Sequence, residues 1–132
     1  MAVDFNKAAC IENTSANVFG ICDDPPVAGI IDQDPAYLSY DNSDAWIAWV
    51  DNHLEKQITF TAIDNCVQIQ RPNGEKESSC DCMLQYDTTL IFVELKDMKK
   101  VFKGAVGQLD ATIGTYKANV GFGAFTKLYA YA

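Results

Sequence analysis

The sequence lacks the features of several protein classes. No apolar run approaches the roughly 20 residues of a membrane span, so we expect no membrane partner. The amino terminus has no basic segment followed by an apolar stretch, which is the pattern of a secretory signal. Histidine occurs once, and Cys80 and Cys82 have no second Cys/His pair with which to form a zinc site.

Cysteine is present in an odd number, which disfavours a disulfide framework. Cys80 and Cys82 lie two residues apart on what the pattern predicts to be one core face of a strand. Free, buried thiols in a reducing compartment explain these observations, and we therefore expect a cytoplasmic protein. The five cysteines are Cys10, Cys22, Cys66, Cys80 and Cys82.

Positive charge is scarce in the first part of the chain. Residues 1–55 contain ten acidic side chains and one lysine, whereas residues 56–132 contain eight acidic and nine basic side chains. The net charge of -8 therefore comes from the front part. This distribution weakens the hypothesis that the partner is nucleic acid, because negative charge repels a polyanion. The second part of the chain is nearly neutral, however, so charge does not exclude that partner.

The length of 132 residues is typical of one domain that can bury a core. Residues 1–42 contain many chain breakers and little periodicity, so we expect an irregular N-terminal arm packed on the body. Residues 43–132 carry the regular patterns and form the predicted core domain.

The first half of the core domain is predicted to contain one helix and a β-rich segment. Ser43 is a suitable helix cap, and apolar side chains at helical spacing follow it, which predicts a helix over 44–56. Residues 58–63 and 66–70 are β-rich, forming either a tight hairpin or one long strand with a bulge. Residues 71–79 form a polar loop with a Pro-Asn-Gly turn at its head.

In the second half of the core domain, the spacing of apolar side chains changes from a period of two residues to a period of 3.6 residues. Apolar spacing predicts a helix over 99–117, whose three glycines we expect to pack closely against a sheet. A final strand follows over 120–131. Both sides of the sheet must be covered, so the fold class is α/β, specifically an α+β mixed sheet with the order α-β-β-β-α-β.

The centre of the chain predicts a β-hairpin with a turn at Asp87-Thr88. Pairing Tyr86 with Thr89 places Asp81 opposite Glu94. Alternation then predicts one wholly apolar face, formed by Cys82, Leu84, Tyr86, Ile91, Val93 and Leu95. The other face is apolar at Met83, Leu90 and Phe92 and polar at one end, where Asp81, Glu94 and Lys96 gather.

Two carboxylates and an amine at the end of an apolar face are costly to bury without a use. A divalent cation between Asp81 and Glu94 would relieve their repulsion, and hard oxygen ligands suit Mg²⁺ or Mn²⁺. Lys96 would point to the same site and could hold or deprotonate an attacking water. The chemistry favours metal-assisted phosphodiester hydrolysis; the alternative is a solvated strand end.

Asp81, twelve intervening residues and then Glu94-Leu95-Lys96 resemble the PD-(D/E)xK signature of restriction endonucleases and Holliday-junction resolvases. The resemblance implies a restriction-endonuclease-like core in α-β-β-β-α-β order over residues 43–131. It implies that Asp81 and Glu94 bind the metal, with the Leu95 carbonyl as a third ligand, and that Lys96 is the catalytic lysine.

Further residues follow from the same resemblance. Gln108 stands where some members have a helix glutamine, and the first-helix acid of many members would be Asp44 or Asp51. Two positions depart from the pattern: Cys80 replaces the proline, and Thr112 stands where RecB-type members have tyrosine.

We therefore expect a Mg²⁺- or Mn²⁺-dependent nuclease whose substrate is nucleic acid, DNA rather than RNA. A homodimer is one assembly that such a nuclease could form. The alternative is a catalytically inactive protein of the same fold that binds a protein partner, as an immunity or regulatory module. The acidic front part of the chain motivates this alternative.

Overall fold

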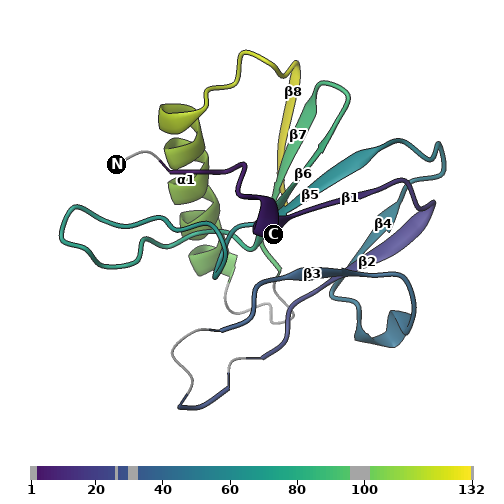
Figure 1. The fold of residues 1–132 in the computed structure, drawn as a ribbon, viewed down its shortest axis with the longest axis horizontal. Helices are drawn as coiled ribbons and strands as arrows, with labels where there is room; N and C mark the ends of the chain where they lie inside the picture. Colours follow the sequence, from purple (N-terminus) through teal and green to yellow (C-terminus); the bar gives the residue numbers. More distant parts are fainter. Residues whose placement is uncertain (1–2, 26, 30–32, 96–101, 132) are drawn as a thin grey trace.

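Two β-sheets and one α-helix make up the described part of the protein, which comprises residues 3–25, 27–29, 33–95 and 102–131 of a computed structural model (Figure 1). The elements in chain order are η1 (Ala8–Cys10), β1 (Ile11–Thr14), β2 (Val18–Cys22), β3 (Tyr37–Ser39), η2 (Ser43–Ala45), β4 (Ala48–Asp51), β5 (Ile58–Ala62), β6 (Cys82–Tyr86), β7 (Thr89–Val93), α1 (Phe102–Asn119) and β8 (Lys127–Tyr131).

The larger sheet has the strand order β1-β5-β6-β7-β8, and the smaller sheet has the order β3-β2-β4. All pairs in both sheets are antiparallel except β7 and β8, which run parallel and are connected through α1. The predicted class, an α+β fold with a mixed sheet, is confirmed. Its predicted element order is not, because the first helix is absent from the described residues.

The central hairpin has the predicted register. Tyr86 pairs with Thr89 and Met83 pairs with Phe92, and Asp87 takes the left-handed conformation (φ 49°) that closes a two-residue turn. The side chains of the two strands belong to two different apolar clusters, as alternation predicts.

One cluster lies between the large sheet and α1, and the other lies between the two sheets. Met83, Leu90 and Phe92 pack toward α1 with Leu109 and Tyr116. The side chains that pack against the smaller sheet include Cys82, Leu84 and Val93 from the hairpin and Phe19, Ile21 and Leu38 from the smaller sheet. The central strands are therefore covered on both faces.

The N-terminal segment is not the irregular arm that the sequence predicted. It supplies β1, which pairs with β5, and β2, which is the middle strand of the smaller sheet. Pro25, Gly29 and Pro35 fall between β2 and β3, whereas Gly20 lies inside β2. A disulfide joins Cys10 to Cys66, so the prediction that all five thiols are free is wrong for this pair, while Cys22, Cys80 and Cys82 are free and buried.

The predicted helix over 44–56 is also wrong. The segment forms the short η2 turn and then β4, in which Val50 pairs with Phe19. Trp46 lies over Gly20, where a Cβ atom would overlap the indole ring. Of the apolar side chains at helical spacing, Val50 lies in a strand whose partner, β2, is distant in the chain, and Trp46 packs on that partner.

Residues 58–70 form one strand and an irregular segment, which differs from both predicted arrangements. β5 pairs with β1 and β6. Between β5 and β6, the one β-type pairing among the described residues is an isolated bridge between Gln70 and Lys76. The polar loop that follows has the predicted turn, with Gly74 at a φ of +86°. In residues 58–70, β5 thus pairs with distant strands and does not form the predicted local hairpin.

The predicted C-terminal helix is confirmed as α1, although residues 96–101 lie outside the described residues. Ala105, Leu109 and Tyr116 are buried, whereas Val106 is 48% exposed. The prediction that its glycines pack closely is wrong, because no atom lies within 4 Å of a Cβ built at any of them. In the described part of the chain, no helix has the length and hydropathy needed to cross a membrane.

Candidate functional site

Asp81 and Glu94 lie at the end of the central hairpin. Asp81 immediately precedes β6 and Glu94 immediately follows β7, one position beyond the Cys82–Val93 pair. Both are buried, with 7% and 3% of their surface exposed. Two acidic side chains at such depth are costly unless hydrogen bonds or a cation stabilise them.

Three hydrogen bonds hold this end of the hairpin, two between backbone groups and one from a backbone N–H to a carboxylate. The Asp81 carbonyl accepts the Ile63 N–H (2.9 Å), and the Glu94 N–H donates to the Tyr131 carbonyl (2.8 Å). The Leu95 N–H donates to the Asp81 carboxylate (2.6 Å). The last of these bonds ties the carboxylate to the segment that continues into Lys96.

A third acidic residue, Asp23, joins the site from the smaller sheet. It directly follows β2, and its side chain is hydrogen-bonded to that of Asp81. Burial raises the pKa of Asp23 to about 7, and the nearby charge of Asp81 adds to this effect. Asp23 can therefore hold or release a proton near neutral pH.

The contact with Asp23 corrects one detail of the predicted hairpin faces. Regular alternation of side chains would place Asp81 on the same face as Met83, but the chain bends at Asp81. As a result Cys80 packs in the α1 cluster while Cys82 packs between the sheets, so these two residues do not share a face. The bend allows the Asp81 carboxyl to meet a residue of the smaller sheet.

Sequence analysis missed Asp23, and the sequence holds only a weak sign of it. An Asp-Asp pair follows the apolar run of Val18–Cys22, which is the place where a strand would end. Nothing in the local pattern places that strand end beside Asp81. The contact arises only when the two sheets pack together.

Asp64 lies close enough to Asp23 to contribute to its raised pKa. Its own carboxylate is compensated, because it pairs with Lys76 (2.8 Å) and accepts a hydrogen bond from Ser79 (3.2 Å).

The two cysteines of the site remain protonated thiols at neutral pH. Burial raises the pKa of Cys80 to about 12, and it raises that of Cys82 well above its ordinary value. The Asp81 and Glu94 carboxylates shift both in the same direction. A thiolate ligand is disfavoured here, so the donors of this site are oxygen atoms.

Gln108 is partly buried on α1, one turn before Thr112. The Thr112 hydroxyl bonds to the Gln108 carbonyl (2.9 Å) and accepts the Cys80 N–H (2.7 Å). This bond fixes α1 to the residue before Asp81. Gln108 therefore lies one helical turn from the residue that contacts Cys80.

The other predicted site residues lie away from Asp81 and Glu94 or fall outside the described residues. Asp51 pairs with Val18, at the opposite end of β2 from Asp23, and it is exposed beside His53 (3.8 Å). Asp44 is exposed in η2. Because the first helix does not form, its expected acid has no such position, and Asp23 is the third acid that the structure brings to Asp81. Lys96 lies outside the described residues.

The oxygen donors suit a magnesium ion by chemical type. Mg²⁺ commonly takes one or two carboxylates and keeps water or phosphate oxygens as its other ligands. Asp81, Glu94 and the Leu95 carbonyl match this requirement. Among the described residues, no three His, Cys, Asp or Glu side chains are grouped so that they could hold a metal ion.

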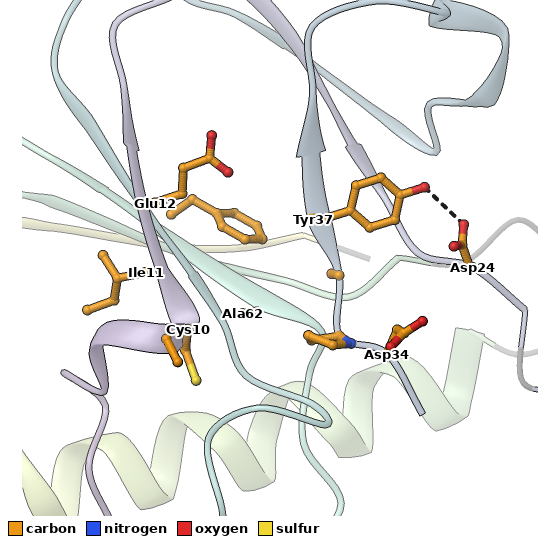
Figure 2. A pocket seen from close by; sticks show the side chains of 11 residues that line it. Cys10, Ile11, Glu12, Asp24, Asp34, Tyr37 and Ala62 are labelled. Carbon is orange, nitrogen blue, oxygen red and sulfur yellow. Dashed lines mark hydrogen bonds between the residues drawn. The ribbon is translucent and has the colours of Figure 1, made fainter. Parts of the chain in front are cut away.

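A separate cavity of about 380 Å³ opens between β1, β3 and β5 (Figure 2). Phe60, Ala62 and Ala36 contribute apolar surface, and the acidic residues Glu12, Asp24 and Asp34 line it without a basic partner among the lining residues. The Tyr37 hydroxyl donates to Asp24 (2.9 Å), which raises the pKa of Tyr37 to about 12. Asp81 and Glu94 do not line this cavity.

Comparisons of the chain with protein-family models, with curated proteins and with solved structures found no match. The resemblance to PD-(D/E)xK nucleases therefore depends on the residues of this chain alone.

Proposed function

We propose that the protein is a metal-dependent nuclease that hydrolyses phosphodiester bonds, in DNA rather than RNA. One observation carries the proposal: Asp81 and Glu94, which flank the β6–β7 hairpin, are both buried at the same end of it. Burial of two acids at adjoining strand ends is costly for a purely structural role, and a bound cation offsets that cost.

In this proposal Asp81, Glu94 and the Leu95 carbonyl hold Mg²⁺ or Mn²⁺. When bound there, the ion would supply Lewis acidity toward a phosphate oxygen and would lower the pKa of a water molecule bound to it. The Leu95 N–H orients the Asp81 carboxylate, and Asp23 can hold or release a proton beside it. Lys96 would position the attacking water or neutralise charge that develops on the phosphate.

The cytoplasmic location is part of the same proposal. The buried thiols of Cys22, Cys80 and Cys82 are compatible with a reducing compartment. The Cys10–Cys66 disulfide favours an oxidising one. Thiol counting on protein alkylated at the moment of cell lysis distinguishes the two: five free thiols support the cytoplasm, and three contradict it.

The experiment is a cleavage assay of the purified protein with single-stranded DNA, duplex DNA and RNA, in Mg²⁺, in Mn²⁺ and in EDTA. We expect cleavage that requires the metal, and a loss of at least about 100-fold in Lys96→Ala, the size seen when one transition-state-stabilising group is removed. Lys117→Ala is the matched control, because Lys117 is an exposed lysine in the last turn of α1. Equal cleavage by Lys96→Ala and the wild type would contradict the proposal.

A second candidate function is supported by the acidic cavity. A catalytically inactive protein could use Glu12, Asp24 and Asp34 to bind a basic partner protein. Absence of cleavage under all these conditions, together with a salt-sensitive complex that Asp34→Asn weakens, would favour this candidate over the nuclease.

A further inference from the structure

β8 is an edge strand whose side chains are unusually accessible for an apolar sequence. All five of its residues are exposed, and Leu128, Tyr129 and Tyr131 have 47%, 44% and 58% of their surface exposed. Neither of the two apolar clusters includes these three residues. Exposed apolar groups gathered on one element are typical of a binding surface.

The two tyrosines form an ordered pair on one face of β8. They are two positions apart, so their side chains share a face, and their ring centroids lie 6.4 Å apart with an interplanar angle of 31°. Lys127 falls on the same face by the same alternation. Two exposed rings in sequence along a strand offer one π-face to each of two successive bases.

This pair borders the candidate cation site. Tyr131 is the partner of Val93 in the parallel β7–β8 register, and its carbonyl accepts the Glu94 N–H at 2.8 Å. One end of the tyrosine pair is therefore one backbone hydrogen bond from a proposed metal ligand. A nucleic-acid chain whose bases stack on both rings would therefore have a phosphate near the proposed metal site.

Charge around β8 is suited to a polyanion, in contrast to the front part of the chain. No acidic residue follows Asp110 in the sequence, and Lys127 is exposed on β8 itself. Residues 1–55, with ten acids, would repel a phosphate backbone. Tyr129 and Tyr131 pair with Ile91 and Val93, so they lie on the side of the large sheet that faces the smaller sheet. Nucleic acid would therefore approach the two rings from the β8 edge, where Lys127 is exposed, and away from the acidic strands.

We propose that Tyr129 and Tyr131 form a stacking platform for unpaired bases, with Lys127 contacting the backbone, and that the substrate is single-stranded nucleic acid. The inference rests on the proposed nuclease function, whose substrate class it names. Bases in an intact duplex are stacked on each other and cannot present their faces to the two rings. Stacking on aromatic side chains tolerates any base, so we expect little sequence preference.

The test measures binding without chemistry. Fluorescence anisotropy of a labelled oligo-dT of about ten nucleotides, in EDTA and about 50 mM salt, gives the Kd of the full chain. The variants are Tyr129→Leu, Tyr131→Leu and the double variant, which retain apolar side chains on the edge strand. Tyr129→Phe keeps the ring, and Tyr40→Leu removes an exposed tyrosine (49%) of the acidic part.

We expect the Kd to rise at least about fivefold in each single leucine variant, and further in the double variant. Tyr129→Phe and Tyr40→Leu should bind like the wild type, and a blunt duplex of the same length should bind more weakly. Circular dichroism verifies that each variant is folded. An unchanged Kd in the double variant, equal binding of the duplex, or no binding by the wild type would overturn the platform.

The outcomes separate this inference from the proposed function. Binding that depends on the tyrosines without any metal-dependent cleavage leaves the platform and rejects the nuclease. Cleavage that depends on Lys96 but is unaffected in the double leucine variant rejects the platform and leaves the nuclease.

Discussion

β7 and β8 are neighbours in one sheet, each five residues long, and they pair in parallel. In β7 four of five residues are buried, including Leu90 and Phe92, whereas all five residues of β8 are exposed. β7 lies between α1 and the smaller sheet, but neither layer covers β8 to a comparable degree. Strand pairing alone does not bury a side chain; the layers above and below the sheet do.

The two strands also end differently. Buried Glu94 directly follows β7, whereas β8 ends at exposed Tyr131, and a backbone hydrogen bond joins these two residues. The boundary between core and surface therefore passes through the candidate site. In the function that we propose, the buried acids would hold a cation and the exposed rings would receive the nucleic acid.

The largest expected effect tests the difference in burial. Phe92→Ala should lower the free energy of unfolding by about 3–5 kcal/mol, because it leaves a cavity beside Tyr116, whose ring lies 5.6 Å away. Tyr129→Ala should cost less than about 1 kcal/mol, because its surroundings are solvent. Urea unfolding followed by circular dichroism measures both, and similar losses would show that β8 is packed in solution.

A smaller effect tests the difference between the strand ends. Mg²⁺ at about 100 times its Kd should stabilise the wild type by about 2.7 kcal/mol, since it binds only the folded state. Glu94→Gln removes a charged ligand and should lose most of this gain, whereas Lys127→Gln should retain it. Thermal unfolding with and without the ion gives the shifts; an equal gain in Glu94→Gln would exclude Glu94 as a ligand.

The smallest effect concerns the carboxyl group beside Asp81. The pKa of Asp23 is about 7 in the folded protein and near 3.8 when it is unfolded, so the folded state binds more protons between these values. Its contribution to stability is complete below about pH 4 and is lost as the pH rises through about 7. In EDTA the melting temperature should therefore be higher at about pH 5 than at about pH 8.

Asp23→Asn should reduce that difference, and Asp34→Asn, an exposed acid of the cavity, should leave it unchanged. The same pH dependence in Asp23→Asn and the wild type would show that Asp23 does not carry the effect.

The central hairpin could be predicted because its determinants are local. A short turn sets the register from Tyr86 and Thr89, and a period of two assigns the side chains to two faces. Asp81 and Glu94 follow from that register alone. The helix α1 was likewise predictable from its apolar spacing, although its exposed glycines have a different environment from the one expected.

The smaller sheet could not be predicted because its determinants are distant. β4 carries apolar side chains that also suit a helix, and only its pairing with β2 selects the strand. Asp23 reaches Asp81 because the two sheets pack and the chain bends at Asp81. No spacing within the sequence encodes that contact.

The sequence by itself thus determined the mixed α+β class, the hairpin and the pair Asp81 and Glu94, since neighbouring residues control turns and periodicity. Tertiary structure decided that the front part forms strands, that Cys10 meets Cys66, that Asp23 joins the acids and that β8 stays uncovered. Each of these depends on which layers pack together, and packing is a property of the whole chain.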